Sequence, residues 1–368
     1  MDLQSAVALS TLPGIHRLRA AAVFKELREL AGDGVLLEAV IEACAPGADA
    51  AAVAAGARAQ AASLLEAAAP AGIEAIPWTD PRYPPLLTTI PDPPAILWVR
   101  GCATVLGEPA VAIVGSRAAT PYALEVAARL AGELADRHLL VVSGLARGAD
   151  GAAHRGALGA GGSTVAVLGS GPDVVYPPEH RDLAVSISRQ GALVSELGPG
   201  APPLPEHFPQ RNRLISGISL AVVVVEASEK SGSLITAQRA LEQGRDVMAV
   251  PGSVLSGRNR GSHGLLKDGA KVVETADDIL EELGWPGRVS PHIPANPLKS
   301  DPLLSRLAAG EAYDLDTLGS IIGMPAPKLL VRVTEWEMQG RMVRLAGGRY
   351  ALSETHYGKG TGGGGVAG

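Results

Sequence analysis

Glycine, serine and arginine recur together directly after short apolar runs in the middle of the chain. The runs are followed by Gly115-Ser116-Arg117, by Ser143-Gly144 with nearby Arg147, and by Ser231-Gly232-Ser233. Glycine lets the backbone approach a ligand closely, serine can donate a hydroxyl, and the planar guanidinium of arginine matches the geometry of phosphate. These residue types therefore indicate an anion site whose ligand is a phosphate group.

Further arginines occur in the same region. Arg117 follows the first run and is expected to bind phosphate, whereas Arg147 is equally suited to bracing the first turn. Arg181 and the sequence Arg211-Asn212-Arg213 add donors further along the chain. Arg211 and Arg213 lie two apart on a predicted helix and face different sides. We therefore expect one of them to contact the ligand and the other to be structural, paired with Glu226.

An acid–base site is the alternative reading of His154, Asp150 and Glu226. A histidine near the start of a helix more often hydrogen-bonds a neighbouring loop, and we expect that role for His154. Asp150 is expected to cap the helix that carries this histidine.

The absence of several motifs restricts the classes of ligand that this site can bind. No G-x-G-x-x-G opens the first predicted helix and no G-x-x-x-x-G-K-[ST] occurs, which argues against a dinucleotide and against Walker-type ATP hydrolysis. The zinc signature of deaminases is missing, and Cys44 and Cys102 have no neighbours at metal or redox spacing. We expect no metal and no cofactor. Aromatic residues make up 3% of the chain, so phosphate contacts rather than base stacking should carry binding, with Phe208 and Tyr176 as the stacking candidates.

The elements that position these residues follow from six uninterrupted apolar runs of strand length. The runs are 111–114, 139–142, 164–168, 192–194, 221–225 and 247–250. Helical windows at 122–137, 151–159, 181–189 and 234–243 alternate with them. Such alternation predicts an α/β domain with a doubly wound, Rossmann-like parallel sheet buried on both faces. Because the carboxyl ends of parallel strands meet at one edge, the polar turns should meet there too. Thr120 and Pro121 are expected at the N-cap and first position of a helix.

The sequence pattern also predicts flanking segments. Leu12-Pro13-Gly14-Ile15 resembles the turn of a helix-hairpin-helix within a helical, SAM-like region. His16 replaces the usual second glycine of that turn, so the favoured interpretation is a small helical bundle with a Pro-Gly turn. A proline-rich stretch over 77–94 predicts an extended segment wrapped over the sheet domain. The predicted organisation is an N-terminal helical domain over 1–75, a Rossmann-like domain over 76–285, a proline-rich linker over 286–302, a winged helix over 303–352 and a disordered glycine-rich tail over 353–368.

The composition is that of a folded protein, with 46% hydrophobic and 19% charged residues among 368. The formal net charge of −6 argues against coating of nucleic acid by bulk electrostatics and leaves a local basic site open. The sequence has no basic segment ahead of an apolar run at its start, and no stretch of about 20 uncharged apolar residues. We therefore expect no signal peptide, no membrane contact and a cytoplasmic location.

Several motifs in one order resemble the DprA/Smf family. They are Ile113-Val114-Gly115-Ser116-Arg117, the segment 143–150 followed by Ala153-His154, Phe208-Pro209 with Arg211-Asn212-Arg213, the segment 231–237, Val250-Pro251-Gly252 and Lys267-Asp268-Gly269-Ala270. The resemblance covers the whole Rossmann-like domain.

The resemblance implies a non-catalytic protein that binds and protects single-stranded DNA through its phosphates. It further implies a homodimer, with Leu265 and Leu266 as a possible dimer surface, and a role in loading the RecA recombinase during natural transformation. Family members often carry a basic residue where this chain has Pro178, and we expect Arg181 to substitute for it.

Two other functions remain open from the sequence. One is a nucleotide-handling hydrolase of the phosphoribohydrolase type that uses the same strand-end site, with Glu226 as its candidate acid. The usual P-G-G-x-G-T-x-x-E run of that class is absent, and Ser231-Gly232-Ser233-Leu234 stands in its place. The other is a regulatory protein that binds duplex DNA through the winged helix.

Overall fold

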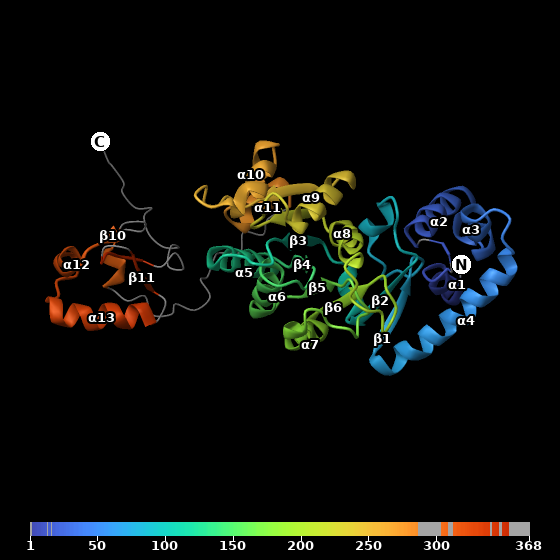
Figure 1. The fold of residues 1–368 in the computed structure, drawn as a ribbon, viewed down its shortest axis with the longest axis horizontal. Coiled ribbons are helices and arrows are strands. Elements are labelled where there is room, and N and C mark those ends of the chain that lie inside the picture. The colour runs from blue at the N-terminus through green and yellow to red at the C-terminus, as the bar shows by residue number, and fades with distance from the viewer. Residues whose placement is uncertain are drawn as a thin grey trace. The chain divides into compact units, whose positions relative to one another are not determined.

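The computed structural model describes residues 2–12, 14–15, 17–285, 303–307, 312–338, 341–345 and 348–352. It divides into two compact units, Met1–Arg288 and Val289–Gly368 (Figure 1). The predicted linker over 286–302 and the glycine-rich tail over 353–368 lie outside the described residues, as do Pro13 and His16 at the Pro-Gly turn near the N-terminus. None of the described helices combines the length and the apolar composition needed to cross a lipid bilayer.

A nine-stranded sheet forms the centre of the first unit, in the order β1-β2-β6-β5-β4-β3-β7-β8-β9. Its strands are β1 (Ile73–Pro77), β2 (Ile96–Gly101), β3 (Ala110–Val114), β4 (Leu140–Ser143), β5 (Thr164–Val167), β6 (Ala192–Ser195), β7 (Ala221–Val224), β8 (Asp246–Ala249) and β9 (Lys271–Val272). Strands β3 to β9 are parallel. All six predicted strands are present, and the doubly wound α/β fold is confirmed.

Two antiparallel strands extend the sheet beyond the predicted core. β2 pairs with β6 in antiparallel sense and β1 pairs with β2, with Ile73 opposite Arg100. The proline-rich stretch is the connection between them and contains a 3-10 helix, η3 (Pro85–Thr89). The predicted boundary between the helical domain and the Rossmann-like domain, between residues 75 and 76, falls within β1. The division of residues 1–285 into two domains stays a prediction.

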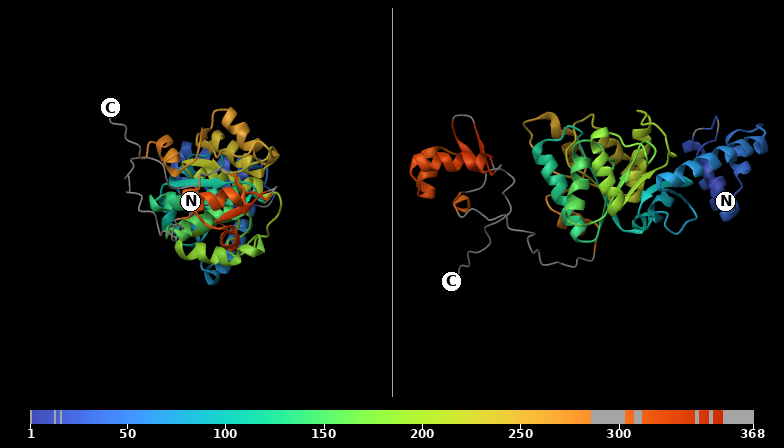
Figure 2. Two further views of the ribbon diagram at one scale, coloured as in Figure 1. Left: turned by 90° about the vertical axis from the view of Figure 1, so that its left-hand side faces the viewer. Right: turned by 90° about the horizontal axis from the view of Figure 1, so that it is seen from below.

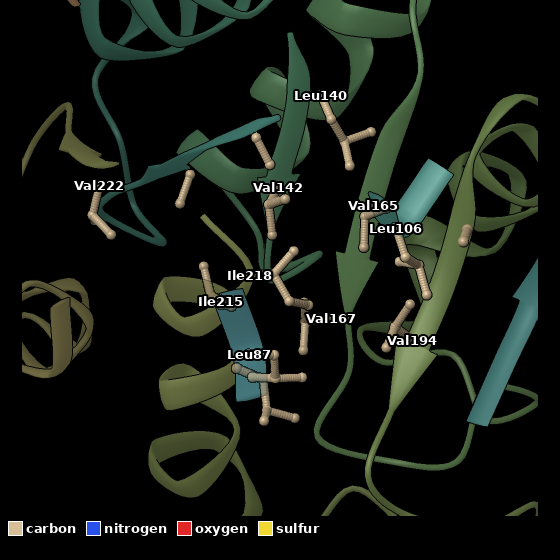
Figure 3. Close-up of a cluster of buried hydrophobic side chains, with 14 of the residues drawn as sticks. Leu87, Leu106, Leu140, Val142, Val165, Val167, Val194, Ile215, Ile218 and Val222 are labelled. Atoms are coloured by element: carbon tan, nitrogen blue, oxygen red, sulfur yellow. The ribbon is translucent and has the colours of Figure 1, made fainter. Parts of the chain in front are cut away.

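Seven helices cover the sheet: α5 (Pro121–Asp136), α6 (Ala149–Gly159), α7 (Arg181–Gln190), α8 (His207–Ile218), α9 (Gly232–Glu242), α10 (Arg260–Lys267) and α11 (Ala276–Glu282). Successive strand side chains point to opposite faces. In β3, Val111 and Ile113 therefore join the core that includes α5 and α6, whereas Ala112 joins the core that includes α8. Figure 3 shows the second core, where Leu87 of η3 and Ile215 and Ile218 of α8 pack beside strand valines. This packing fixes α8 beneath the turns that follow the strands.

Four N-terminal helices lie at the β1–β2 end of the sheet: α1 (Leu3–Leu9), α2 (Arg17–Ala31), α3 (Leu37–Cys44) and α4 (Ala50–Ala68) (Figure 2). They share a core with residues of the antiparallel strands, including Ile73, Ile96 and Trp98. The alanine-rich α4 buries Ala54, Ala57, Ala61 and Ala68 along one side. Small side chains at this spacing let the helix approach its neighbours closely.

The second unit is a small α/β module. Its elements are η7 (Leu304–Arg306), β10 (Ala312–Tyr313), α12 (Leu315–Ile322), α13 (Ala326–Met338), β11 (Met342–Arg344) and β12 (Tyr350–Leu352). The strands form an antiparallel sheet in the order β10-β12-β11, and Leu318, Leu329, Val333 and Trp336 form the core. Among its described residues, two α-helices follow one another, and the first element is a single 3-10 turn. The assignment of this unit as a winged helix stays a prediction.

Candidate phosphate-binding site at the carboxyl edge of the sheet

The turns after β3, β4, β7 and β8 contact one another at the carboxyl edge of the sheet. Ala149 N donates to Ser116 O at 3.2 Å, which joins the first two turns. Arg258, in the loop after β8, donates through Nη1 to Ala118 O at 2.8 Å. A Cβ on Gly115 would lie 2.7 Å from Ala149 Cβ and 3.3 Å from Glu226 N. The absence of a side chain at Gly115 therefore allows three of the turns to meet.

Arg117 is an exposed cation of this edge. Its guanidinium carbon lies 5.7 Å from the centroid of the Phe208 ring. Tyr176 packs against the same ring, with 5.5 Å between centroids. Among the described residues no carboxylate oxygen lies within ion-pair distance of the Arg117 guanidinium. The aromatic face orients this arginine without neutralising it, which suits it to bind an anion from solvent.

The first turn and the helix after it are fixed by side-chain hydrogen bonds. Thr120 caps α5 and accepts a bond from Ala123 N, and Pro121 occupies the first turn, as the sequence predicts. Buried Glu226 accepts from Thr120 Oγ1 at 2.7 Å. Ser116 Oγ accepts from Ala118 N at 3.2 Å. The carboxylate proposed as a hydrolase acid is therefore engaged in holding the start of α5.

The predicted role of Asp150 as a helix cap is wrong. Gly148, with φ of 75°, is the N-cap of α6. Asp150 lies within the first turn of α6, fully enclosed, and accepts from Gly144 N at 3.0 Å and from Ala146 N at 3.4 Å. Burial raises the pKa of its carboxyl, and Arg211 and these backbone donors oppose the rise. Ser143 is also buried and donates to Ile113 O at 2.6 Å. Asp150 and Ser143 thus hold the backbone of the second turn through buried hydrogen bonds.

Arg211 and Arg213 are both buried, and they meet different partners, as their spacing of two on a helix predicts. Arg213 donates to Glu196 Oε1 at 2.8 Å and to Asp92 Oδ2 at 2.9 Å, not to Glu226. Arg211 lies under Gly144 and beside Asp150, where burial lowers its pKa to about 10. Both arginines are buried because the second turn covers one side of α8 and the segment before β2 covers another.

The remaining predicted residues occupy different positions along the edge. Arg147 is exposed and forms an ion pair with Glu179, so its charge is partly neutralised. Arg181 is exposed at the start of α7. Asn212 Nδ2 donates to Gly232 O at 3.4 Å and joins α8 to the start of α9. Ser231 caps α9, and its hydroxyl lies 2.7 Å from that of Ser233.

His154 is a structural residue, as expected, but its partner lies in a strand rather than in a neighbouring loop. It is fully buried, and its Nδ1 lies 2.8 Å from Thr164 Oγ1, which itself donates to Val141 O. Burial, together with the nearby positive groups, lowers the pKa of His154 to about 3. The imidazole is therefore neutral at ordinary pH and serves to join α6 to β4 and β5.

Two exposed cations of this edge were not predicted as ligand contacts. Lys230 directly precedes the cap of α9, and Arg258 lies in the loop after β8. Both residues follow the carboxyl ends of strands, and this position in the sequence could have predicted them as ligand contacts. Leu265 and Leu266 of α10 are half-buried, and Leu265 packs against the core shared with α8. Part of the predicted dimer surface therefore already packs within the chain.

A separate cavity of about 400 Å³ lies at the N-terminal helices, lined by Lys25, Arg28, Glu29, Gly32, Trp78 and Thr88. Lys25 Nζ donates to Thr89 O and Ile90 O, and Arg28 stacks over the Trp78 ring. These contacts tie α2 to the segment before β2, away from the strand-end turns.

Comparisons with known proteins match the domain that carries this edge. A family model described as DNA recombination-mediator protein A matches residues 74–284. Protein Smf of Escherichia coli (strain K12) is 40% identical over 287 residues, which cover 75% of this chain and 77% of Smf.

Two solved structures share the fold. The X-ray structure of DNA processing protein A (DprA) from Streptococcus pneumoniae matches with a TM-score of 0.67 and 37% identity, over 76% of this chain and 97% of that one. A structure of DNA processing protein A from Helicobacter pylori, described for its single-stranded DNA binding mode, matches with a TM-score of 0.52 and 28% identity. It covers 57% of this chain and 95% of its own.

Proposed function

This chain belongs to the DNA recombination-mediator protein A (DprA/Smf) family, and we propose from this membership that it binds single-stranded DNA at the carboxyl edge of its sheet. The relative from Helicobacter pylori is described as a single-stranded DNA binder, and the shared fold supports the same ligand for this protein. The strand is held through phosphates, so binding tolerates any sequence.

The observation that carries this proposal is the state of Arg117. Its guanidinium is exposed, stacked on Phe208 and not paired with a carboxylate of the described residues. It lies in the turn after β3, and the neighbouring strand β7 leads to the start of α9, where the Ser231 and Ser233 hydroxyls lie 2.7 Å apart. A phosphodiester placed there gains a charge-assisted hydrogen bond in a setting that is already organised.

The site acts by binding rather than by catalysis in this proposal. Glu226, the acid that a phosphoribohydrolase would need, is 1% exposed and bonded to Thr120. His154 is enclosed and neutral. The functions that family membership further supports are protection of the strand, delivery of it to the RecA recombinase during transformation, and work as a homodimer in the cytoplasm.

The test is fluorescence anisotropy of labelled oligo-dT and its duplex with the wild type, Arg117→Ala and Arg189→Ala. Arg189 is an exposed arginine near the end of α7, at the opposite edge of the sheet. A charge-assisted hydrogen bond contributes about 1.5–3 kcal/mol, so Arg117→Ala should weaken single-strand binding by about tenfold or more. Arg189→Ala should bind as the wild type does, and the duplex should bind more weakly than the single strand.

Equal binding by the two variants would remove Arg117 from the site. Release of ribose 5-phosphate from AMP by the wild type, abolished in Glu226→Gln, would show that the protein is an enzyme. Acceleration of RecA-dependent strand exchange by the wild type, lost together with DNA binding in Arg117→Ala, would support the loading role.

A further inference from the structure

The loop between β8 and α10 presents two large aliphatic side chains to solvent. Val254 is 81% exposed and Leu255 is 95% exposed. Burial of such a side chain stabilises a folded protein, yet here two adjacent aliphatic side chains stay exposed to solvent. Single exposed apolar residues are ordinary, but an adjacent pair at the tip of one loop indicates a contact made with something else.

Hydrogen bonds fix the base of this loop while leaving its tip bare. Ser253 Oγ accepts from Leu255 N at 3.2 Å, and Ser253 O accepts from Asn259 Nδ2 at 3.3 Å. His263 Nε2 lies 3.1 Å from Gly252 O. The two aliphatic residues are therefore held out by a defined turn.

The same loop is joined to the turn that carries Arg117. Arg258 donates to Ala118 O at 2.8 Å, and the Tyr122 hydroxyl donates to Pro251 O at 3.2 Å. Both acceptor segments follow strand ends, so Val254 and Leu255 project from the edge of the sheet that holds the proposed DNA site.

Exposed charge on this side of the site is positive. The turns after β3, β7 and β8 carry the exposed cations Arg117, Lys230, Arg258 and Arg260 against one exposed carboxylate, Glu229, which lies 3.8 Å from Arg260. On the β4–β5 side, Arg147 is paired with Glu179, and the exposed acids Asp173 and Asp182 outnumber exposed Arg181. A polyanion bound at Arg117 is therefore drawn toward the β8 loop.

We propose that Val254 and Leu255 form an apolar tip that packs against the bases of the single strand whose phosphates are bound at Arg117. This inference rests on the proposed function. Unpaired bases expose their apolar faces, and aliphatic side chains can insert between them without reading sequence. The site has few aromatic residues for stacking, so the aliphatic pair supplies the base contact that Phe208 and Tyr176 alone provide only in part. Paired bases are stacked and enclosed, so the tip favours single strands over duplex.

The test compares oligo-dT with an abasic strand of equal length, which keeps the phosphates and lacks the bases. The variant is Val254→Ser combined with Leu255→Ser, and the control is Leu241→Ser, an exposed leucine near the end of α9. Because these side chains are exposed, the substitutions leave the fold intact. The wild type should bind oligo-dT at least tenfold more tightly than the abasic strand. The double variant should lose most of that difference, with abasic binding within about twofold of the wild type and an unchanged salt dependence.

Other outcomes overturn the inference. Equal wild-type affinity for the two strands would refute a base contact while leaving phosphate binding at Arg117 intact. Equal losses on both strands in the double variant would assign the loop to phosphates or to folding. A dimer that dissociates in the double variant without DNA, seen by sedimentation, would make a second copy of this chain the partner of the tip. Failure of the wild type to bind either strand would refute the proposed function itself.

Discussion

Replacement of Arg213 should destabilise the protein strongly while leaving its DNA affinity nearly unchanged. The side chain is 3% exposed and bridges Glu196, itself 6% exposed, and Asp92. Arg213→Met removes the cation and leaves the carboxylate of Glu196 buried without its partner. Breaking one side of a buried pair costs about 3–5 kcal/mol. For a domain of this size each kcal/mol lowers the melting temperature by about 2–4 °C, so a fall of at least about 6 °C is expected.

Differential scanning calorimetry measures this fall, and anisotropy below the lowered melting temperature measures DNA affinity. The matched variant is Arg213→Met combined with Glu196→Leu, which removes both charges. It should recover part of the lost stability, because apolar replacement of a buried pair is often close to neutral. If Arg213→Met melted at the wild-type temperature and bound DNA more than tenfold more weakly, the buried bridge would be refuted and Arg213 would belong to the DNA site.

Two further predictions follow from the interior of the site. His154 has a pKa near 3 in the folded protein, against an ordinary value of 6.5. Below pH 6.5 the unfolded chain binds a proton at His154 that the folded protein does not bind. The free energy of unfolding that His154 contributes is therefore complete above pH 6.5 and is lost as the pH falls toward 3, by about 2 kcal/mol at pH 5. His154→Gln should therefore flatten the decline in unfolding free energy between pH 7 and pH 5, and an unchanged decline would contradict the assignment. Gly144→Ala would place a Cβ over Arg211 Nη1 and 2.8 Å from Asp150 Oδ2, so it should cost about 1–3 kcal/mol of stability and weaken DNA binding. Gly159→Ala, where no atom lies within 4 Å of the added Cβ, should do neither, and a Gly144→Ala variant that matches it in both measurements would argue against the close packing.

The sheet was predictable because each of its central strands is a short, uninterrupted apolar run, and such runs occur where both faces are buried. The turns that carry Arg117 and Ser231 were predictable for a related reason, since parallel strands bring their carboxyl ends to one edge. Thr120 was recognisable as a helix cap from local sequence alone, because Pro121 follows it, and it caps α5 as predicted.

The antiparallel strands and the buried arginines were not predictable from local pattern. β1 and β2 adjoin prolines, which suggest irregular structure, yet the pairing of β2 with β6 satisfies their backbone groups. Arg213 meets Asp92 across 121 residues of sequence, a contact that only the folded path of the chain reveals. Helical spacing correctly separated Arg211 from Arg213 but could not show that other segments cover both faces of α8.

The salt dependence of single-strand binding tests the central claim most directly. If three or four phosphates are neutralised, log K for oligo-dT should fall with log salt at a slope of roughly −2 to −3, since each phosphate contributes about 0.7. Arg117→Ala should bind more weakly and show a slope smaller by about 0.7, the loss of one phosphate contact. A variant with the wild-type slope and the wild-type affinity would contradict the placement of the DNA phosphates at this edge of the sheet.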